Sequence, residues 1–242
     1  REAGDRATEV DSYFYLAAVY SFRSVSKAIE CVEKCLHIVR EAGDPVKEGQ
    51  TYLFLGILYK FHNDLPKAIE CYEKASNIAR EAGDRTTEGE AYLNLGIVYD
   101  SRSDLPKAID CYEKASNIAR EAGDRTTEGE ACLNLGIVYD SRSDLPKAID
   151  CFEKASNIAR EAGDRSAEGK AYLRLGILYN SHNHDLPKAI ECYKKASNIA
   201  REACAWATEA AAYLNLGTVY YARNDLPKAI ECYEKASNIA RE

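Results

Sequence analysis

The sequence predicts an all-α protein, an α-solenoid of six helix–turn–helix units. The first observation is an internal repeat whose pentapeptide Leu-Pro-Lys-Ala-Ile recurs at steps of 40, 40, 41 and 40 residues. Its copies begin at Leu65, Leu105, Leu145, Leu186 and Leu226, with a degenerate copy at Val25. The second observation is that each repeat holds two apolar stripes with the spacing of an α-helix. A regular period of this length indicates stacked helical repeats.

Residues 84–121 illustrate how one repeat encodes its two helices. Asp84 follows a glycine and is a good N-cap for the first helix. Asp104 caps the second helix, and Pro106 lies just inside it, where a missing N–H costs little. Gly123 ends this helix, because glycine readily takes the positive φ of a C-terminal cap. The two apolar stripes are Tyr92, Leu95, Gly96 and Tyr99, then Ala108, Ile109, Tyr112, Ala115 and Ile118.

The same pattern sets the expected unit boundaries within a single array over residues 1–242. The units are expected at residues 6–41, 45–81, 85–121, 125–161, 165–202 and 206–242. Residues 81–120 and 121–160 differ at only two positions, which indicates recent duplication or design. The chain contains no methionine and both its ends fall within a repeated phrase, so we expect it to be a segment of a longer protein.

The run from Tyr92 to Tyr99 (YLNLGIVY), followed by Ala108, Tyr112 and Ala115, resembles the signature of tetratricopeptide repeats. The match covers essentially the whole chain. The 40-residue period is longer than the usual 34 and is similar to that of Pins/LGN-type adaptors, kinesin light chains and the sensor arrays of NB-ARC-type signalling ATPases. The resemblance implies a right-handed superhelix whose first helices line a concave groove.

Two places depart from the pattern. In the first unit, Ala17 and Ser26 replace the usual Gly and Pro, and the turn is one residue shorter. At residues 203–207 the sequence Ala-Cys-Ala-Trp-Ala has lost both the glycine stop and the aspartate cap. Alanine favours a continuous helix, but burying one unit against the next is worth several kcal/mol at about 25 cal/mol per Å². We therefore expect a turn, with one long helix as the alternative.

The best candidate binding residues stand just before the Leu-Gly pair of each repeat. This position holds Asn94, Asn134 and Asn215, but Phe54 and Arg174 in two other units. The resemblance implies that these side chains face the groove, where an amide can grip the backbone of an extended peptide because it both donates and accepts hydrogen bonds. The alternative is that they are ordinary solvated asparagines on an open helix face.

Charged residues on the same helices suggest the kind of partner. Glu90, Asp100, Glu130 and Asp140 are expected to make the middle of the groove acidic, which favours a partner segment with Lys or Arg. These acidic residues are expected to be flanked by Lys60, Lys170 and Arg174. Phe61 and Tyr221 are expected to be apolar contacts near the two ends of the groove. The alternative is that these charges only keep the protein soluble.

The nine cysteines predict neither disulfides nor a metal site. Six of them, Cys31, Cys71, Cys111, Cys151, Cys192 and Cys232, recur at one position of the second helices. Equivalent atoms of stacked helix pairs lie roughly 10 Å apart, whereas a disulfide needs Cα atoms within about 7 Å. We expect nine free thiols and hence a reducing, cytoplasmic compartment. His182 and His184 fall at a one-residue insertion and lack companion metal ligands.

Composition narrows the function classes further. The net charge is −7, which argues against a nucleic-acid surface, and no run approaches the roughly 18 apolar residues of a membrane span. No phosphate-binding loop, nucleophile elbow or acid–base pair of recognised spacing is present, so we expect no catalytic residue, no cofactor and no enzyme activity.

These observations favour a protein–protein interaction scaffold or adaptor that binds an extended peptide or a short helix in the groove. Self-association through the ends of the array is a further expectation. The alternative function is a sensor or autoinhibitory repeat segment of a larger signalling ATPase or other enzyme.

Overall fold

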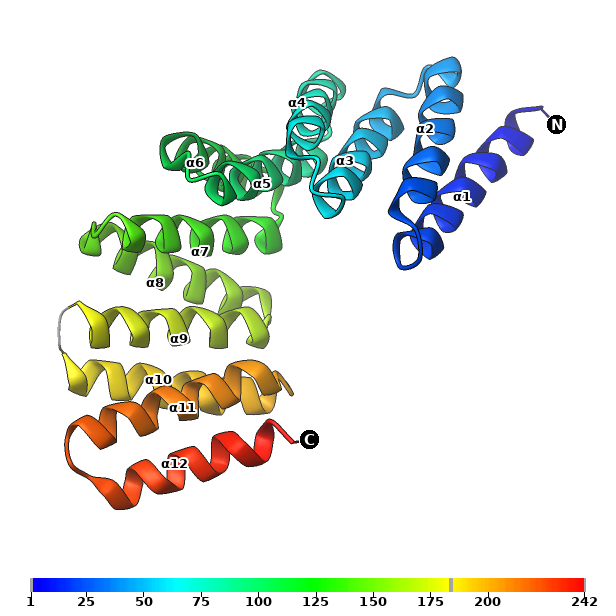
Figure 1. Ribbon diagram of the computed structural model, residues 1–242. Coiled ribbons are helices and arrows are strands. Elements are labelled where there is room, and N and C mark those ends of the chain that lie inside the picture. Colours follow the sequence, from blue (N-terminus) through cyan, green and yellow to red (C-terminus); the bar gives the residue numbers. More distant parts are fainter. Residues whose placement is uncertain (1, 183–184, 242) are drawn as a thin grey trace. The chain divides into compact units, whose positions relative to one another are not determined.

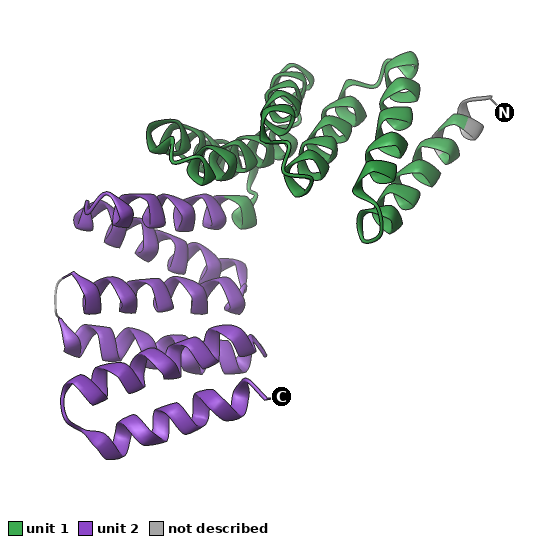
Figure 2. Ribbon diagram, viewed as in Figure 1, with its two compact units in different colours: residues 1–127 green, residues 128–242 purple. Residues whose placement is uncertain are grey.

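The computed structural model describes residues 2–182 and 185–241, and these residues form twelve α-helices and no strand (Figure 1). The predicted all-α repeat architecture is thereby confirmed. The chain divides into two compact units, residues 1–127 and 128–242 (Figure 2). The first unit contains α1 (Glu2–Ser21), α2 (Val25–Ala42), α3 (Pro45–Phe61), α4 (Leu65–Ala82), α5 (Arg85–Ser101) and α6 (Leu105–Ala122). The unit boundary falls within α7 (Arg125–Ser141), and the second unit continues with α8 (Leu145–Ala162), α9 (Arg165–Ser181), α10 (Leu186–Glu202), α11 (Trp206–Ala222) and α12 (Leu226–Ile239).

The helix ends are set by the capping residues that the sequence shows. The Asp84 side chain accepts a hydrogen bond from the N–H of Thr87 at 3.2 Å. Asp104 accepts in the same way from the N–H of Lys107 at 3.4 Å. Gly123 has a φ of 74°, the left-handed conformation that a glycine C-cap adopts. Local sequence therefore fixes these boundaries, whereas α1 begins at Glu2, four residues earlier than expected.

The junction at residues 203–207 is a turn, as expected. Cys204 stands where other repeats have glycine and adopts the same left-handed conformation, with a φ of 52°. The N–H of Ala205 donates to the carbonyl of Ala200 at 2.8 Å, which matches the bond from Asp84 to Ala79 in an ordinary repeat. Tertiary packing thus overrides local helix propensity. Since Cys204 bears a Cβ, this conformation costs it about 1–2 kcal/mol more than it costs glycine.

Within each repeat, a glycine of the first helix packs on an aromatic ring of the second. A Cβ added to Gly96 would lie only 2.5 Å from Cε1 of Tyr112. The same contact joins Gly56 to Tyr72, Gly136 to Phe152, Gly176 to Tyr193 and Gly217 to Tyr233. In the first repeat both partners differ: Ala17 takes the place of the glycine and Val32 the place of the aromatic residue, and both are fully buried. A larger residue on one helix is thus matched by a smaller one on the other.

Neighbouring repeats stack so that their first helices are closer together than their second helices. Within the units, α3 touches α5 and α9 touches α11, and no comparable contact joins two second helices among the described residues. A stack of this kind bends towards its first helices. We therefore call the exposed side of the first helices the inner face of each unit, and the side of the second helices the outer face.

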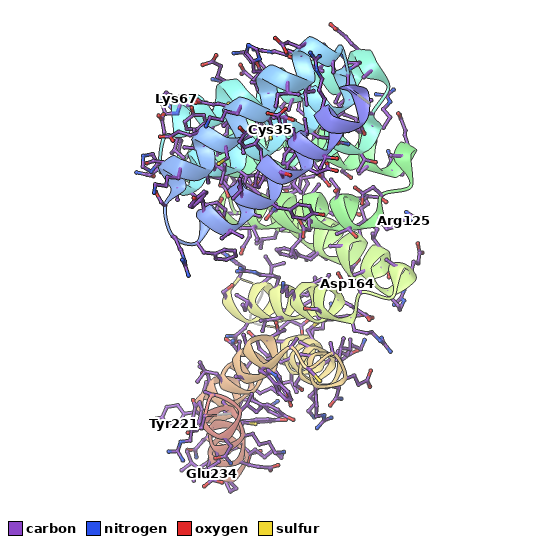
Figure 3. The ribbon with its side chains drawn as sticks, turned by 90° about the vertical axis from the view of Figure 1, so that its right-hand side faces the viewer. Cys35, Lys67, Arg125, Asp164, Tyr221 and Glu234 are labelled. Atoms are coloured by element: carbon purple, nitrogen blue, oxygen red, sulfur yellow. The ribbon has the colours of Figure 1, made fainter. Side chains whose placement is uncertain are left out.

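All nine cysteines are free, as expected, and only Cys204 is exposed. Figure 3 shows Cys35 among the helices of the first unit. Burial raises the pKa of the Cys35 thiol to about 11, and the Cys71 and Cys192 thiols respond in the same way. These thiols are therefore packing groups. Over the described part of the chain, no helix is both long and apolar enough to span a bilayer.

Candidate functional site

The predicted binding residues all lie on first helices. The first unit carries Lys60 on α3 and Glu90, Asn94 and Asp100 on α5. The second unit carries Glu130, Asn134 and Asp140 on α7, Arg174 on α9, and Asn215 and Tyr221 on α11. These residues therefore form two sets, one on each unit.

Asn94 is the centre of a small polar network on the first unit. Its Nδ2 donates to the backbone carbonyl of Glu90, one helical turn earlier, at 2.9 Å. Its Oδ1 accepts a hydrogen bond from Nζ of Lys60 on α3 at 3.0 Å. A primary amide has two donor hydrogens and two acceptor lone pairs. The network therefore fixes the orientation of the half-buried amide and leaves one N–H and one lone pair for another molecule.

Asn215 repeats part of this arrangement on the second unit. Its Nδ2 donates to the carbonyl of Ala211 at 2.8 Å, again one helical turn earlier. Asn134 on α7 is half-buried at the equivalent position. The corresponding residue of α3, Phe54, instead packs against Phe14 of α1, with their ring centroids 6.0 Å apart. The second repeat thus has an aromatic side chain, packed on the first repeat, where α5, α7 and α11 have asparagine.

Two charged residues of the first unit are partly withdrawn from water. Burial lowers the pKa of Lys60, and burial raises the pKa of Asp100, because each environment disfavours the charged form. Lys60 was expected to flank the acidic residues, but it bonds directly to Asn94. Asn94, predicted to bind a peptide backbone, and Lys60, predicted to border the acidic residues, are therefore direct neighbours.

Asp140 on the second unit lies beside the one-residue insertion. Its Oδ1 is 3.0 Å from Nε2 of His182. This buried oxygen makes no hydrogen bond among the described residues, so the two side chains are close without a hydrogen bond between them. His184, the other histidine of the insertion, lies outside the described residues. Among the residues that the structure describes, no group of three or more metal-binding side chains comes together.

The remaining predicted residues are freely accessible. Glu130, Lys170 and Arg174 are exposed on α7 and α9. Phe61 and Tyr221 are large hydrophobic side chains with 72% and 64% exposure, and Figure 3 shows Tyr221 at the edge of the second unit. Exposed aromatic side chains on a helical surface are suitable contacts for a partner protein.

Sequence reasoning missed a second recurring surface feature, on the outer face. The lysine of each Leu-Pro-Lys-Ala-Ile copy stacks on a tyrosine that precedes it by eight or nine residues. Its Nζ lies 5.0–5.4 Å from the ring centroid in the pairs Lys67–Tyr59, Lys107–Tyr99, Lys147–Tyr139, Lys188–Tyr179 and Lys228–Tyr220. This spacing in the repeat could have revealed the cation–π pairs.

A family model described as tetratricopeptide repeat matches residues 64–121, 87–161 and 167–242, which together make up most of the chain. A search of curated protein sequences finds no significant match.

Solved structures with the same fold include BtubC from P. vanneervenii, which is 23% identical, with a TM-score of 0.79 and coverage of 90% of this chain and 91% of that one. The STAND ATPase with a tetratricopeptide repeat sensor from Pyrococcus horikoshii is 22% identical, with a TM-score of 0.80. The match covers 95% of this chain but 35% of the ATPase. A kinesin light chain from Podospora anserina with nearly identical repeats is 16% identical, with a TM-score of 0.63 and coverage of 80% and 96%. At these identities the likeness establishes the fold alone.

Proposed function

Because the chain belongs to the tetratricopeptide repeat family, a family of protein-interaction modules, we propose that it is a non-catalytic scaffold that holds an extended peptide or a short helix on the inner face. Each unit offers an inner face of this kind, with Asn94 on the first unit and Asn134 and Asn215 on the second. The nine free thiols support a reducing, cytoplasmic setting for this role.

The observation that carries the proposal is the oriented amide of Asn94. Holding a polar side chain in place before binding lowers the entropy lost when a partner arrives. Lys60 and the Glu90 carbonyl hold the Asn94 amide on two sides, while its free N–H and lone pair match the C=O and N–H of a peptide backbone. This geometry supports recognition of main chain, so it would accept different partner sequences.

Charge supports a preference among partners. Burial raises the pKa of Asp100, so an arriving cation would find a carboxylate that is poorly solvated. Glu130 is exposed on α7, and Asp140 faces His182. A partner segment with Lys or Arg next to its backbone contacts would place positive charge against these carboxylates.

The test begins with a peptide selected from a phage-displayed library against the immobilised protein. Its affinity is then measured by fluorescence anisotropy for the Asn94→Ala, Asn134→Ala double variant. Each amide bond is worth roughly 0.5–1.5 kcal/mol, so we expect binding to weaken by about 1–3 kcal/mol, or about five- to 150-fold.

The matched control is the Lys107→Ala, Lys147→Ala double variant, because both lysines stack on outer-face tyrosines. It should bind the peptide as wild type does. If the asparagine variant retains full affinity while the lysine variant loses it, the partner binds the outer face and the proposal is wrong.

Self-association through the ends of the array belongs to the same proposal. Val19 on α1 and Ile230 on α12 are 59% and 57% exposed. The equivalent residues inside the units, such as Leu58 and Ile69, are covered by the adjacent repeat. Sedimentation analysis of wild type and of the Ile230→Lys variant tests this, since the variant should shift any oligomer towards monomer.

The alternative function is that of a sensor segment within a larger signalling ATPase. The supporting observation is the fold likeness to the Pyrococcus horikoshii ATPase over 95% of this chain. Sequencing the full-length transcript distinguishes the two functions, because the alternative requires an ATPase domain in the same polypeptide.

A further inference from the structure

The second unit has a pocket of about 350 Å³ on its outer face, between α10, α11 and α12. It arises from the bend of the unit, since α11 touches α9 while the neighbouring second helices are spread apart. Tyr213 and Tyr220 of α11 contribute two of its walls, and lysines of α10 and α12 surround it.

The first unit has an equivalent pocket of about 380 Å³ between α4, α5 and α6. The two pockets are lined by the same repeat positions, with one exchange that alters charge: Lys194 replaces Glu73. The pocket of the first unit has two lysines and two acidic residues and is neutral. The pocket of the second unit has three lysines against one acid, Glu231, and is positive.

In other repeats the glutamate at this position interacts with a tyrosine of the first helix that follows. The hydroxyl of Tyr59 donates a hydrogen bond to Oε1 of Glu33 at 3.2 Å. Glu73 lies close enough to contribute to the raised pKa of Tyr99, which is caused first by burial. Lys194 cannot accept a hydrogen bond. In the pocket of the second unit, a lysine that can only donate therefore stands where the first unit has a glutamate that can accept.

The other two lysines of the pocket are already held in place. Nζ of Lys228 lies 5.4 Å from the ring centroid of Tyr220 and bonds to Asp225 at 2.7 Å. Nζ of Lys235 lies 5.4 Å from the ring of Tyr213 and bonds to Glu231 at 2.6 Å. Lys194 makes no ion pair with any described residue, so its charge remains available.

We propose that this pocket binds an acidic segment of a partner protein, with an anionic side chain seated between Lys194 and the hydroxyl of Tyr220. The two tyrosine rings provide apolar walls for the stem of that side chain, and the lysines provide donors for a carboxylate or a phosphoryl oxygen. A long polyanion is disfavoured because the chain as a whole carries a net charge of −7. The site is separate from the inner face and would allow the scaffold to hold a second segment.

Two fluorescein-labelled probes of equal length test this: a glycine-flanked triglutamate peptide, and the same peptide in which glycine-phosphoserine-glycine replaces the three glutamates. Binding is measured by fluorescence anisotropy at low salt with the whole chain. We expect Lys194→Glu to weaken binding by at least about tenfold, because it reverses the charge nearest the anion. This variant should fold, since glutamate occupies the same position in the other repeats.

Three further variants make the test specific. Lys47→Glu changes the net charge equally but lies on α3, and it should bind both probes as wild type does. Glu73→Lys should add a second binding site, in the pocket of the first unit. The Asn94→Ala, Asn134→Ala variant should keep full affinity for these probes, which separates this site from the inner face.

Binding of only one probe identifies the anion as carboxylate or phosphoryl, and either result supports the pocket. The proposal is overturned if neither probe binds at millimolar concentration, or if Lys194→Glu binds as wild type. Equal losses in Lys194→Glu and Lys47→Glu would show a diffuse charge effect and would also overturn it. An unchanged stoichiometry in Glu73→Lys would show that the lysine does not create the site.

Discussion

Replacing Gly96 by alanine tests whether the two helices of a repeat pack closely because a side chain is missing. The new Cβ would lie 2.5 Å from Cε1 and 2.6 Å from Cδ1 of Tyr112, whose ring is 1% exposed and has no room to move. Overpacking of this kind costs about 1–3 kcal/mol, while alanine gains about 1 kcal/mol of helix propensity over glycine. A contact this short in so enclosed a place favours the upper part of the range. We expect a net loss of about 1–2 kcal/mol.

Two companion variants isolate the cause. Gly89→Ala lies on the same helix, but its Cβ would meet Cγ2 of Ile118 at an ordinary 3.6 Å, so it should stabilise by up to about 1 kcal/mol. Tyr112→Val copies the first repeat, where Ala17 is accommodated by Val32. In the Tyr112→Val background, Gly96→Ala should cost about 1–2 kcal/mol less than it does alone.

The assay is urea-induced unfolding followed by far-UV circular dichroism, with the m value compared between variants to show that the same surface is exposed. The reasoning is refuted if Gly96→Ala stabilises the protein as Gly89→Ala does. It is also refuted if Gly96→Ala costs the same with tyrosine or valine at position 112, since the ring would then not be the obstacle.

Three further variants and one change of pH test the packing. Cys204→Gly should stabilise by about 1–2 kcal/mol because it relieves a positive φ, and Ala205→Asp should add about 1 kcal/mol by restoring an N-cap; both are measured in urea. Tyr72→Phe should stabilise by about 1 kcal/mol, because the buried Tyr72 hydroxyl has no hydrogen-bond partner; an unchanged or lower midpoint would argue against this. Burial raises the pKa of the Cys71 and Cys111 thiols from 9.0 to about 11. As the pH rises, the unfolded chain loses these thiol protons before the folded chain does. The free energy of unfolding should therefore be unaffected by the two thiols below pH 9 and fall as the pH rises from about 9 to about 11. Unfolding midpoints measured across this range test the prediction.

Features encoded within a few neighbouring residues could be predicted from the sequence. The cap at Asp84 and the glycine stop at Gly123 depend on local backbone geometry, so a single repeat suffices to identify them. The turn at Cys204 required one more step, a comparison of helix propensity with the energy of burying the next unit.

Contacts between repeats could not be predicted in the same way. The bond between Lys60 and Asn94 joins residues 34 positions apart, and its existence depends on how closely α3 approaches α5. No pattern within one helix encodes that approach. The outer pockets depend likewise on the gap between second helices, which follows from the bend within each unit.

Differences between repeats of this one chain indicate which surfaces carry specificity. The second helices are nearly identical, because their residues fill the core: Ala115 and Cys111 recur in every equivalent place from α4 to α12. The first helices differ mainly at exposed and half-buried positions. The position of Asn94 holds Phe, Asn, Asn, Arg and Asn from α3 to α11, and the position of Asp100 holds Lys, Asp, Asp, Asn and Tyr.

Packing explains Phe54, which lies against Phe14, but not the other exchanges, since the buried neighbours Leu95 and Gly96 recur unchanged in all five of these helices. A scaffold of this kind can therefore change the residues that face a partner without altering the residues that hold it together. Lys194 is likewise a difference between repeats at a surface position. It reverses a charge at a second-helix position where α2, α4, α6, α8 and α12 all carry glutamate. Since that position is exposed, the core gains nothing from the exchange, and its effect falls on the pocket beside it.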